Sequence, residues 1–190
     1  GGKIWYQTID GKPPVGICGS GILEIVAEMR SAEIVDKRGV FVKSSPWVTV
    51  KSGKPGFELI PAAKTGREAA IIINRGDINE IQLAKSAIRA GVEVLIHEAG
   101  INKSDIDQFI IAGAFGTYLD IQQSINIGMF PDLPINRFVQ IGNAAGVGAR
   151  QMLLSRQKRV EAAEIANRMN YIELTVNSHF TDFYMDSMYI

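Results

Sequence analysis

The sequence predicts a mixed α/β fold, because short apolar runs alternate with segments of helical periodicity along its 190 residues. A second observation is that glycine-rich turns lie at the expected starts of helices, over residues 16–21, 113–116 and 142–148. Small residues at such junctions let a backbone approach a phosphate group or a flat ring. The alternation and the turns together indicate an α/β domain that binds a nucleotide.

The apolar runs are expected to form one mixed sheet flanked by helices. Residues 36–68 contain further short runs between Ser-, Pro- and Gly-rich turns, and there we expect an irregular, hairpin-rich insertion over the surface. The whole chain, 1–190, is predicted to be a single domain. The strands of the sheet are expected near Ile4, Ile72, Ile110, Val139 and Ile172.

The expected helices follow these runs in order. The first begins at Gly21 and continues for about 12 residues. The best-defined helix covers residues 78–99, with a capping box of Asp77 and Glu80 at its start and Gly100 at its end. Shorter helices are expected over 120–127, 144–155 and 160–169, and an amphipathic tail with Phe180, Phe183 and Met188 closes the chain.

Composition restricts the class of protein and its partners. Lys and Arg (20) balance Asp and Glu (20), so no excess of positive charge favours nucleic acid. No apolar run approaches the roughly 20 residues that a membrane span needs, and no signal peptide opens the chain. The lone Cys18 cannot form an internal disulfide, which fits a reducing compartment. We therefore expect a cytoplasmic protein with neither a nucleic-acid nor a membrane partner.

The turn Gly113, Ala114, Phe115, Gly116 is the main candidate for contact with a nucleotide, since it ends the apolar run 109–112. The structural alternative is a tight strand-to-helix turn without a ligand, which is common in α/β proteins. The spacing does not match the G-x-G-x-x-G order followed by an acidic residue, so binding of a dinucleotide is the weaker hypothesis about the ligand.

Two other helix starts could contact an anion or a ligand. Gly19, Ser20 and Gly21 place free backbone N–H groups at a helix N-terminus. Beside them, Cys18 could have a lowered pKa or bind a metal, although a small buried thiol is the favoured interpretation. Asn143 could cap the next helix or hydrogen-bond a ligand, and the sequence leaves both alternatives open.

One helix face carries a second candidate surface. Gln82, Lys85, Ser86 and Arg89 share one polar face of helix 78–99 because of their spacing. The usual interpretation is a solvated helix face. The alternative is a contact with adenosine, in which a cation's stem lies along the base and the amide bonds the ribose.

The sequence offers no metal site and no set of catalytic residues. One cysteine is too few for a metal site, and His97 and His179 are far apart in the sequence. Both histidines are interpreted as structural or exposed. No nucleophile, histidine and acid can be grouped from their spacing, so the catalytic residues are left unassigned.

Several motifs, taken in order, resemble the C-terminal part of the ATP-dependent reductive activators of corrinoid proteins. The resemblance covers nearly the whole chain and includes Tyr171–Leu174 and the Phe-rich tail. These activators belong to the superfamily of acetate and sugar kinases, heat-shock chaperones and actin. The motifs are GICGSGIL at 16–23, DINEIQLAK at 77–85, AGAFGTYLD at 112–120 and GNAAG at 142–146.

The resemblance implies a ribonuclease-H-like half of an actin-like ATPase. In that superfamily the turn that matches Gly113–Gly116 packs against the adenosine. Two residues of a helix, at the positions that match Gln82 and Lys85, lie on the other side of the nucleoside. The implied cofactors of the intact protein are ATP with Mg and a 2Fe-2S cluster, the latter in a ferredoxin domain outside this chain. The implied activity is the ATP-driven return of a corrinoid from Co(II) to Co(I).

The implied partner is a corrinoid protein or a corrinoid methyltransferase subunit, and formation of a homodimer is left open. The Asp-x-Gly phosphate hairpins of the superfamily are missing, so this chain is expected to be a C-terminal portion that binds no cofactor tightly and is inactive alone. Cys18 matches a cysteine that helps bridge a 4Fe-4S cluster in 2-hydroxyacyl-CoA dehydratase activators. Those proteins use a second cysteine, so no cluster is expected here. The alternatives are half of a small-molecule kinase and a non-catalytic docking module for a corrinoid protein.

Overall fold

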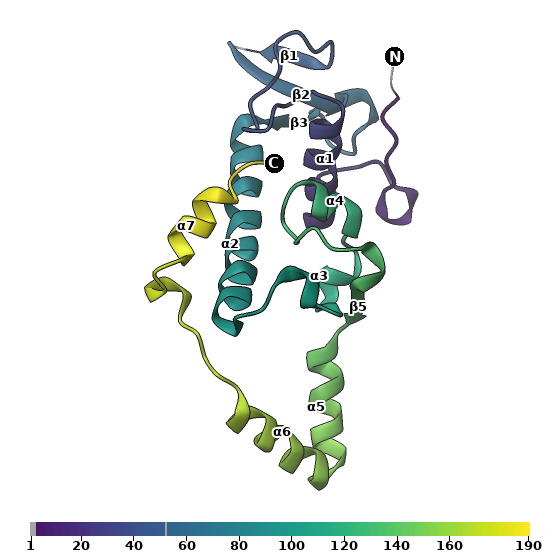
Figure 1. Cartoon of the computed structure of the whole chain (residues 1–190). Coiled ribbons are helices and arrows are strands. Elements are labelled where there is room, and N and C mark those ends of the chain that lie inside the picture. The colour runs from purple at the N-terminus through teal and green to yellow at the C-terminus, as the bar shows by residue number, and fades with distance from the viewer. Residues whose placement is uncertain (1–2, 52) are drawn as a thin grey trace.

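The computed structural model describes residues 3–51 and 53–190, which form a body of two small sheets and several helices, with a helical arm projecting from it (Figure 1). One sheet is antiparallel and lies at one end of the molecule, with α1 and α2 extending from it. The other is a parallel pair of strands beside these helices. The arm leaves the body where that second sheet ends.

The antiparallel sheet consists of β1 (Val48–Lys51), β2 (Lys54–Ile60) and β3 (Ile71–Asn74), in that order. Phe57 on β2 stands opposite Val48 on one side and Ile73 on the other, and Phe57 and Ile73 are both buried. The strand predicted near Ile72 is confirmed, and two of the short runs within 36–68 also lie in strands, whereas Phe41 makes only an isolated bridge to Val35. That residues 36–68 form an insertion stays a prediction, since β2 pairs directly with the strand that follows it.

Helices α1 (Gly19–Ser31) and α2 (Arg75–Ala99) supply much of the core. The predicted capping box of α2 is wrong by one turn. Asn74 Oδ1 accepts hydrogen bonds from Gly76 N and Asp77 N, and Asp77 Oδ2 accepts from Asn74 N at 2.8 Å. Asn74 ends β3 and therefore starts the helix earlier than the apolar periodicity indicates. Gly100 ends α2 in the left-handed conformation (φ 63°), as predicted.

The parallel pair is formed by β4 (Phe109–Ala112) and β5 (Phe138–Gly142), with α3 (Ala114–Thr117) and α4 (Ile121–Asn126) in the connection between them. The rings of Phe109, Phe130 and Phe138 pack together, with centroids 5.2–5.9 Å apart. Because the strands are parallel, their carboxyl ends meet at one edge. This edge carries two of the glycine-rich turns.

In the part of the chain that the structure describes, two of the expected strands do not form, and there are two separate sheets rather than one mixed sheet. Residues 3–8 have no regular structure, and the run near Ile172 leads into a short 3-10 helix, η5 (Leu174–Val176). An alternating run becomes a strand only when a sheet edge receives it. Trp5 and Tyr171 are more than four-fifths exposed, so neither run packs against an edge in the described part of the chain.

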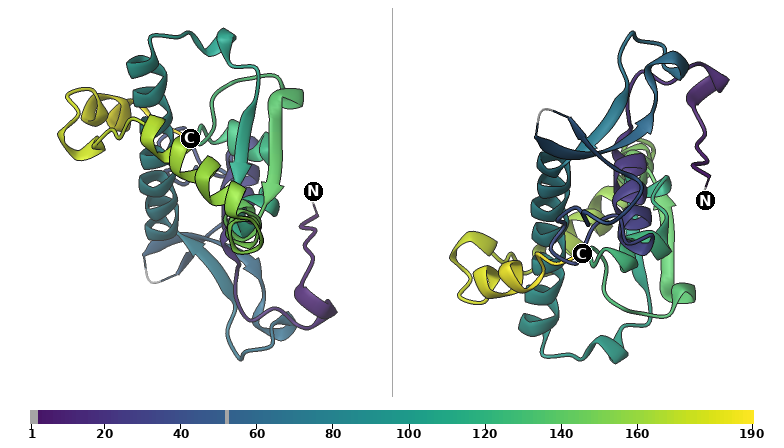
Figure 2. Two further views of the ribbon diagram at one scale, coloured as in Figure 1. Left: turned by 90° about the horizontal axis from the view of Figure 1, so that it is seen from below. Right: turned by 90° about the horizontal axis from the view of Figure 1, so that it is seen from above.

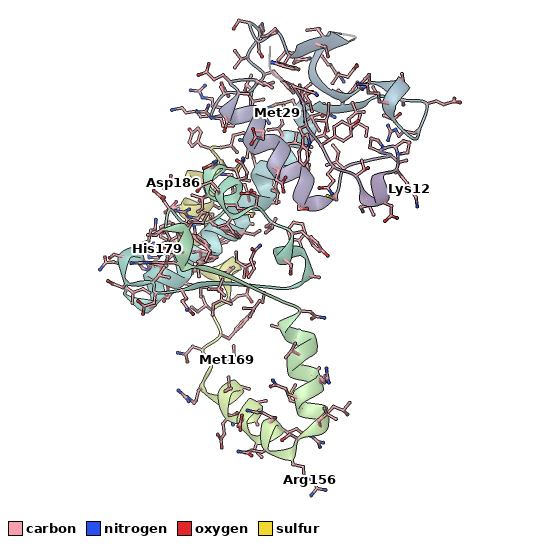
Figure 3. The ribbon with its side chains drawn as sticks, turned by 90° about the vertical axis from the view of Figure 1, so that its right-hand side faces the viewer. Lys12, Met29, Arg156, Met169, His179 and Asp186 are labelled. Carbon is pink, nitrogen blue, oxygen red and sulfur yellow. The ribbon has the colours of Figure 1, made fainter. Side chains whose placement is uncertain are left out.

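Beyond β5 the chain forms an arm and then returns to the body. Helices α5 (Ala144–Leu154) and α6 (Arg156–Arg168) make the arm, whose tip and return lie near Arg156 and Met169 (Figure 3). Leu153 and Leu154 are about three-quarters exposed there. Helix α7 (Phe180–Asp186) then packs along α2, on the side away from α1 (Figure 2). Among the described residues, no helix has the length and apolar character needed to cross a bilayer.

Candidate functional site

The structure brings the glycine-rich turns together. Gly113, at the end of β4, donates its backbone N–H to the carbonyl oxygen of Gly142, at the end of β5, at 2.6 Å. The ring of Phe115 lies against the start of α1, where a Cβ on Gly19 would come within 2.8 Å of it. Parallel pairing of β4 and β5 and the seating of Phe115 therefore assemble one site from segments that are far apart in the sequence.

The two glycines around Ala114 and Phe115 serve different purposes. Gly113 has φ 106° and ψ 154°, a conformation that other residues adopt only under strain, and a Cβ there would meet nothing within 4 Å. Gly116 is buried, and a Cβ there would lie 2.5 Å from Ile111 Cγ2. Gly116 is thus required for packing α3 on β4, whereas Gly113 leaves open space beside the strand end.

A glutamine inside the apolar run of β5 holds this turn in place. Gln140 Nε2 donates to the carbonyl oxygens of Gly116, at 2.5 Å, and Leu119, at 3.0 Å. Gln140 is not among the site residues predicted from the sequence. The sequence does carry a sign of this role, because Gln140 is the polar residue within the apolar run Phe138–Ile141. A polar side chain in such a run indicates a hydrogen-bond partner close to the strand.

The start of α1 corrects one expectation. Cys18 is exposed rather than buried, and its Sγ accepts a hydrogen bond from Gly21 N at 3.4 Å as the helix cap. Hydrogen bonds from the Ser20 hydroxyl and from the Gly21 N–H hold the pKa of the Cys18 thiol below its usual value. Gly19, Ser20 and Gly21 form the first turn of the helix, which therefore begins two residues before the predicted start at Gly21.

Substituting Cys18 tests this cap. Serine is the better acceptor, so Cys18→Ser is expected to raise the free energy of unfolding slightly, by about 0.5 kcal/mol. Cys18→Ala removes the acceptor and is expected to lower the free energy of unfolding by about 0.5–1 kcal/mol. Urea unfolding of both variants measures the effect. Equal stability of the two variants would show that the Sγ contact does not cap the helix.

Asn143 acts as a helix cap in the structure. Its Oδ1 accepts a hydrogen bond from Gly146 N at 2.9 Å, at the start of α5. The neighbouring Gly142 has φ 63°, which turns the chain sharply from β5 into that helix. A ligand contact by Asn143, the other alternative, stays a prediction.

The polar face of α2 is buried, so its interpretation as a solvated helix face is wrong. Gln82, Lys85 and Ser86 are each at most 3% exposed. They are covered by residues 187–190, which we call the strap. The strap crosses α2 after α7 and ends between α2 and α1 (Figure 2).

The buried face binds the main chain of the strap. Gln82 Nε2 donates to the carbonyl oxygen of Met188 at 2.7 Å, and Ser86 Oγ donates to that of Ser187 at 2.8 Å. Lys85 Nζ donates to the carbonyl oxygens of Ser187 and Tyr189. Gln82 and Lys85 were predicted to lie across a nucleoside from the glycine turns. Their hydrogen bonds go instead to the strap. Gln82 also donates to the carbonyl oxygen of Arg38 and accepts a hydrogen bond from the guanidinium of Arg75.

Arg89, the last member of that polar face, serves a different contact. Its guanidinium donates to the carbonyl oxygen of Phe130 at 2.6 Å and pairs with Glu93 at 2.7 Å. It therefore connects α2 to the segment that leads into β5. The charge of Arg89 also acts on Lys85 one turn away.

Lys85 is a buried cation with neutral partners. Burial, followed by the charge of Arg89, lowers the pKa of Lys85 from 10.5 to about 8. Within the described residues its hydrogen-bond partners are carbonyl oxygens, and no carboxylate forms an ion pair with it. The strap thus covers a site of positive charge.

The lowered pKa predicts how stability depends on pH. Between about pH 8 and 10.5 the unfolded chain holds the Lys85 proton more firmly than the folded chain does. Stability should therefore rise with pH across this window, with a contribution from Lys85 of up to about 3 kcal/mol. Urea unfolding of the wild type and of Lys85→Met at pH 7.5, 8.5 and 9.5 isolates this contribution as their difference. A difference that does not change with pH would contradict the lowered pKa.

The residues that hold the strap are not among those predicted from the sequence. Ile190 is nine-tenths buried in the core, its N–H donates to the carbonyl oxygen of Lys37 at 2.9 Å, and Arg30 Nε donates to its carbonyl oxygen at 3.2 Å. His97 and His179 are far apart in the sequence, but their ring centroids lie 4.2 Å apart between α2 and α7. The apolar residues of the tail were the available signal, but they do not indicate which surface the tail covers.

Comparisons with known proteins agree with this architecture. The family model described as the C-terminal domain of RACo, the ASKHA domain, matches residues 2–190. A solved structure, the reductive activator for corrinoid, iron-sulfur protein, is 39% identical and superimposes with a TM-score of 0.89 over 99% of this chain and 30% of its own. The mixed α/β, actin-like half-fold predicted from the sequence is thereby confirmed.

Two curated proteins are similar to the chain. The corrinoid activation enzyme RamQ of Eubacterium limosum is 33% identical over 193 residues, which is 97% of this chain and 32% of RamQ. The [Co(II) methylated amine-specific corrinoid protein] reductase of Methanosarcina barkeri is 26% identical over 173 residues, which is 90% of this chain and 28% of the reductase. The chain spans about a third of the length of these relatives. It belongs to the family of C-terminal ASKHA domains of the reductive activators of corrinoid proteins.

Proposed function

We propose that the chain is the nucleotide-binding C-terminal portion of an ATP-dependent reductive activase, which returns the corrinoid of a partner protein from Co(II) to Co(I). The observation that carries the proposal is the meeting of the glycine turns, in which the backbone of Gly113 bonds that of Gly142 beside the start of α1. The relatives support it, because their names describe corrinoid activation and the reduction of a Co(II) corrinoid protein.

In this proposal the chain's own residues bind and orient the nucleoside. The open side of Gly113 receives the base or ribose, since no side chain of the described residues fills it. In the first turn of α1, the backbone N–H groups of Gly19 and Ser20 donate to anionic oxygens, while that of Gly21 is bonded to Cys18 Sγ. Phe115, half exposed beside Gly19, gives an apolar wall. Asn143 caps α5 and holds the second turn in place.

The remaining parts of the proposal concern the intact protein. ATP with Mg supplies the free energy for an uphill electron transfer, and a 2Fe-2S domain outside this chain supplies the electron. The proposed partner is a corrinoid protein or a corrinoid methyltransferase subunit, and the proposed location is the cytoplasm. The test is ATP-dependent formation of Co(I) by the full-length polypeptide with a corrinoid protein, followed by its visible absorbance. Reduction that proceeds at the same rate without ATP would contradict the proposal.

The proposal also predicts the binding behaviour of residues 1–190 alone. If the phosphate hairpins and the acid that positions Mg lie elsewhere in the polypeptide, this chain offers the nucleoside side of the site and, for the phosphates, only the backbone N–H groups at the start of α1. ATP and adenosine should then bind weakly and within about 3-fold of one another, a difference of less than 1 kcal/mol, and no hydrolysis should occur. Isothermal titration calorimetry with both ligands measures this. ATP binding far tighter than adenosine binding, or measurable turnover, would show that the main phosphate contacts lie within this chain.

A further inference from the structure

A pocket of about 280 Å³ lies between the loop 36–40, the first turns of α2 and the strap. Its volume is near the lower limit for a site that binds a small organic molecule. The loop and α2 contribute polar side chains to its lining, whereas α7 and the strap contribute apolar ones. The polar residues are Arg38, Arg75 and Asn79, and the apolar residues are Met185, Met188 and Tyr189.

The two arginines of this pocket have no acidic partner among the described residues. Arg75 donates to the side-chain oxygen of Gln82 at 2.9 Å and to the carbonyl oxygen of Arg38 at 3.1 Å, and both of these acceptors are neutral. The guanidinium of Arg38 donates to no acceptor in residues 3–51 and 53–190. The pocket therefore gathers positive charge that the described chain does not neutralise.

The acidic residues nearest in sequence to these arginines stabilise turns of their own. Asp36 Oδ1 accepts hydrogen bonds from the backbone N–H groups of Arg38 and Val40, at 2.8 and 2.9 Å. Asp77 Oδ2 accepts from Asn74 N at the start of α2. Both carboxylates are thus used for the backbone, and the guanidiniums are left for another anion.

Glycine at position 39 brings the loop close enough to α2 to form the pocket. Gly39 has φ 72°, and a Cβ there would lie 2.7 Å from Gln82 Oε1 and 2.8 Å from Ile78 Cγ2. A larger residue would push the loop, and with it Arg38, away from Arg75. On the opposite side the ring of Tyr189 is 56% exposed, and Lys37 Nζ lies 5.8 Å from its centroid. The lining thus combines apolar surface with a third cation at its edge.

We propose that this pocket binds a phosphate monoester that carries a small apolar body. A phosphate monoester has a charge of about −1.5 to −2 at pH 7, which matches two guanidiniums. Its oxygens accept the paired hydrogen bonds that a guanidinium donates, and the amide of Asn79 supplies a further donor. The apolar body lies against Tyr189 and the methionines beside it, whose flexible side chains adapt to its shape.

The pocket is separate from the glycine turns. The strap, which forms part of its lining, is bonded to Arg30 in the last turn of α1, whereas Phe115 lies against Gly19 in the first turn. The rise of an α-helix sets these two ends roughly 15 Å apart. The pocket is therefore a second site, and its ligand is not the proposed nucleotide.

The first test is calorimetric titration of the full-length polypeptide with phenyl phosphate, in the presence of saturating ADP and Mg. One equivalent of phenyl phosphate should bind. Benzoate, with a single charge, should bind at least 5-fold more weakly, and the neutral benzyl alcohol should not bind detectably. Absence of phenyl phosphate binding overturns the proposal. Binding that occurs only when ADP is omitted also overturns it, because the probe would then lie in the nucleotide site.

The second test substitutes the arginines. Arg38→Gln removes a side chain without hydrogen bonds to the described residues, so it should weaken phenyl phosphate binding at least 5-fold without disturbing the fold. Arg75→Gln should weaken it at least 10-fold. Arg159→Gln is the matched control, because the guanidinium of Arg159 likewise donates to main-chain carbonyl oxygens but lies on the arm, and it should leave the affinity unchanged. Wild-type affinity in Arg38→Gln overturns the proposal.

Amide hydrogen exchange locates the bound probe. Phenyl phosphate should slow exchange about 3-fold or more in residues 36–40 and 187–190, and leave β4 and β5 unchanged. The Ile190 N–H is a direct reporter, since it is bonded to the carbonyl oxygen of Lys37 and so joins the strap to the loop. Unchanged exchange in both segments overturns the proposal. The expected pattern in a polypeptide that does not bind ADP supports this pocket and contradicts the proposed function alone.

Discussion

Lys85→Glu is expected to detach the strap and to lower the free energy of unfolding by about 3–5 kcal/mol, the cost of an unpaired buried charge. Lys85 is 1% exposed and faces the carbonyl oxygens of Ser187 and Tyr189. An ionised carboxylate has no donor for these carbonyl oxygens, which are themselves acceptors. It would therefore lose its hydration without gaining a hydrogen bond. Protonation of the new carboxyl group would recover only part of this loss.

Urea unfolding and amide exchange of residues 180–190 measure the effect of Lys85→Glu. The matched control is Lys64→Glu, the same change at an exposed lysine of the 3-10 helix Ala62–Lys64, which should alter stability by less than about 0.5 kcal/mol. Wild-type stability of Lys85→Glu would show that the strap is not seated on α2 in solution.

The local parts of the site could be predicted from the sequence because they depend on local chemistry. Glycine at 113 and at 142 is required by positive φ angles of 106° and 63°, and such turns stand out as small residues after an apolar run. The start of α2 was misplaced because N-x-x-D at Asn74 and D-x-x-E at Asp77 both fit a capping box. Only the end of β3 decides between them, and that end depends on pairing with β2.

The strap could not be predicted, because its contacts depend on the tertiary structure. The sequence pattern of a polar helix face is the same whether water, a ligand or another segment covers it, as for Gln82, Lys85, Ser86 and Arg89. Here a segment about a hundred residues later in the chain covers it through backbone atoms, which carry no sequence signal. Likewise, the runs near Ile4 and Ile172 have strand character, but no sheet edge pairs with them in the described residues.

Gly113→Val is expected to abolish nucleotide binding by the full-length polypeptide, with a loss of at least about 100-fold in affinity, or roughly 3 kcal/mol. The Cβ at this position points into space that no side chain fills, and in the proposed site the nucleoside lies there. A branched side chain would occupy that space. The substitution also strains the backbone, since φ 106° and ψ 154° suit glycine alone.

A matched variant separates the strain from the blocked site. Gly100→Val places the same side chain at another glycine of positive φ (63°) with nothing within 4 Å, at the far end of α2. It should lower the free energy of unfolding by about 1–3 kcal/mol and leave ADP affinity unchanged, because it only strains the chain. ADP titration and urea unfolding of both variants then give affinity and stability independently. Wild-type ADP affinity in a folded Gly113→Val protein would remove the end of β4 from the nucleotide site, and equal losses of affinity in the two variants would attribute the effect to stability alone.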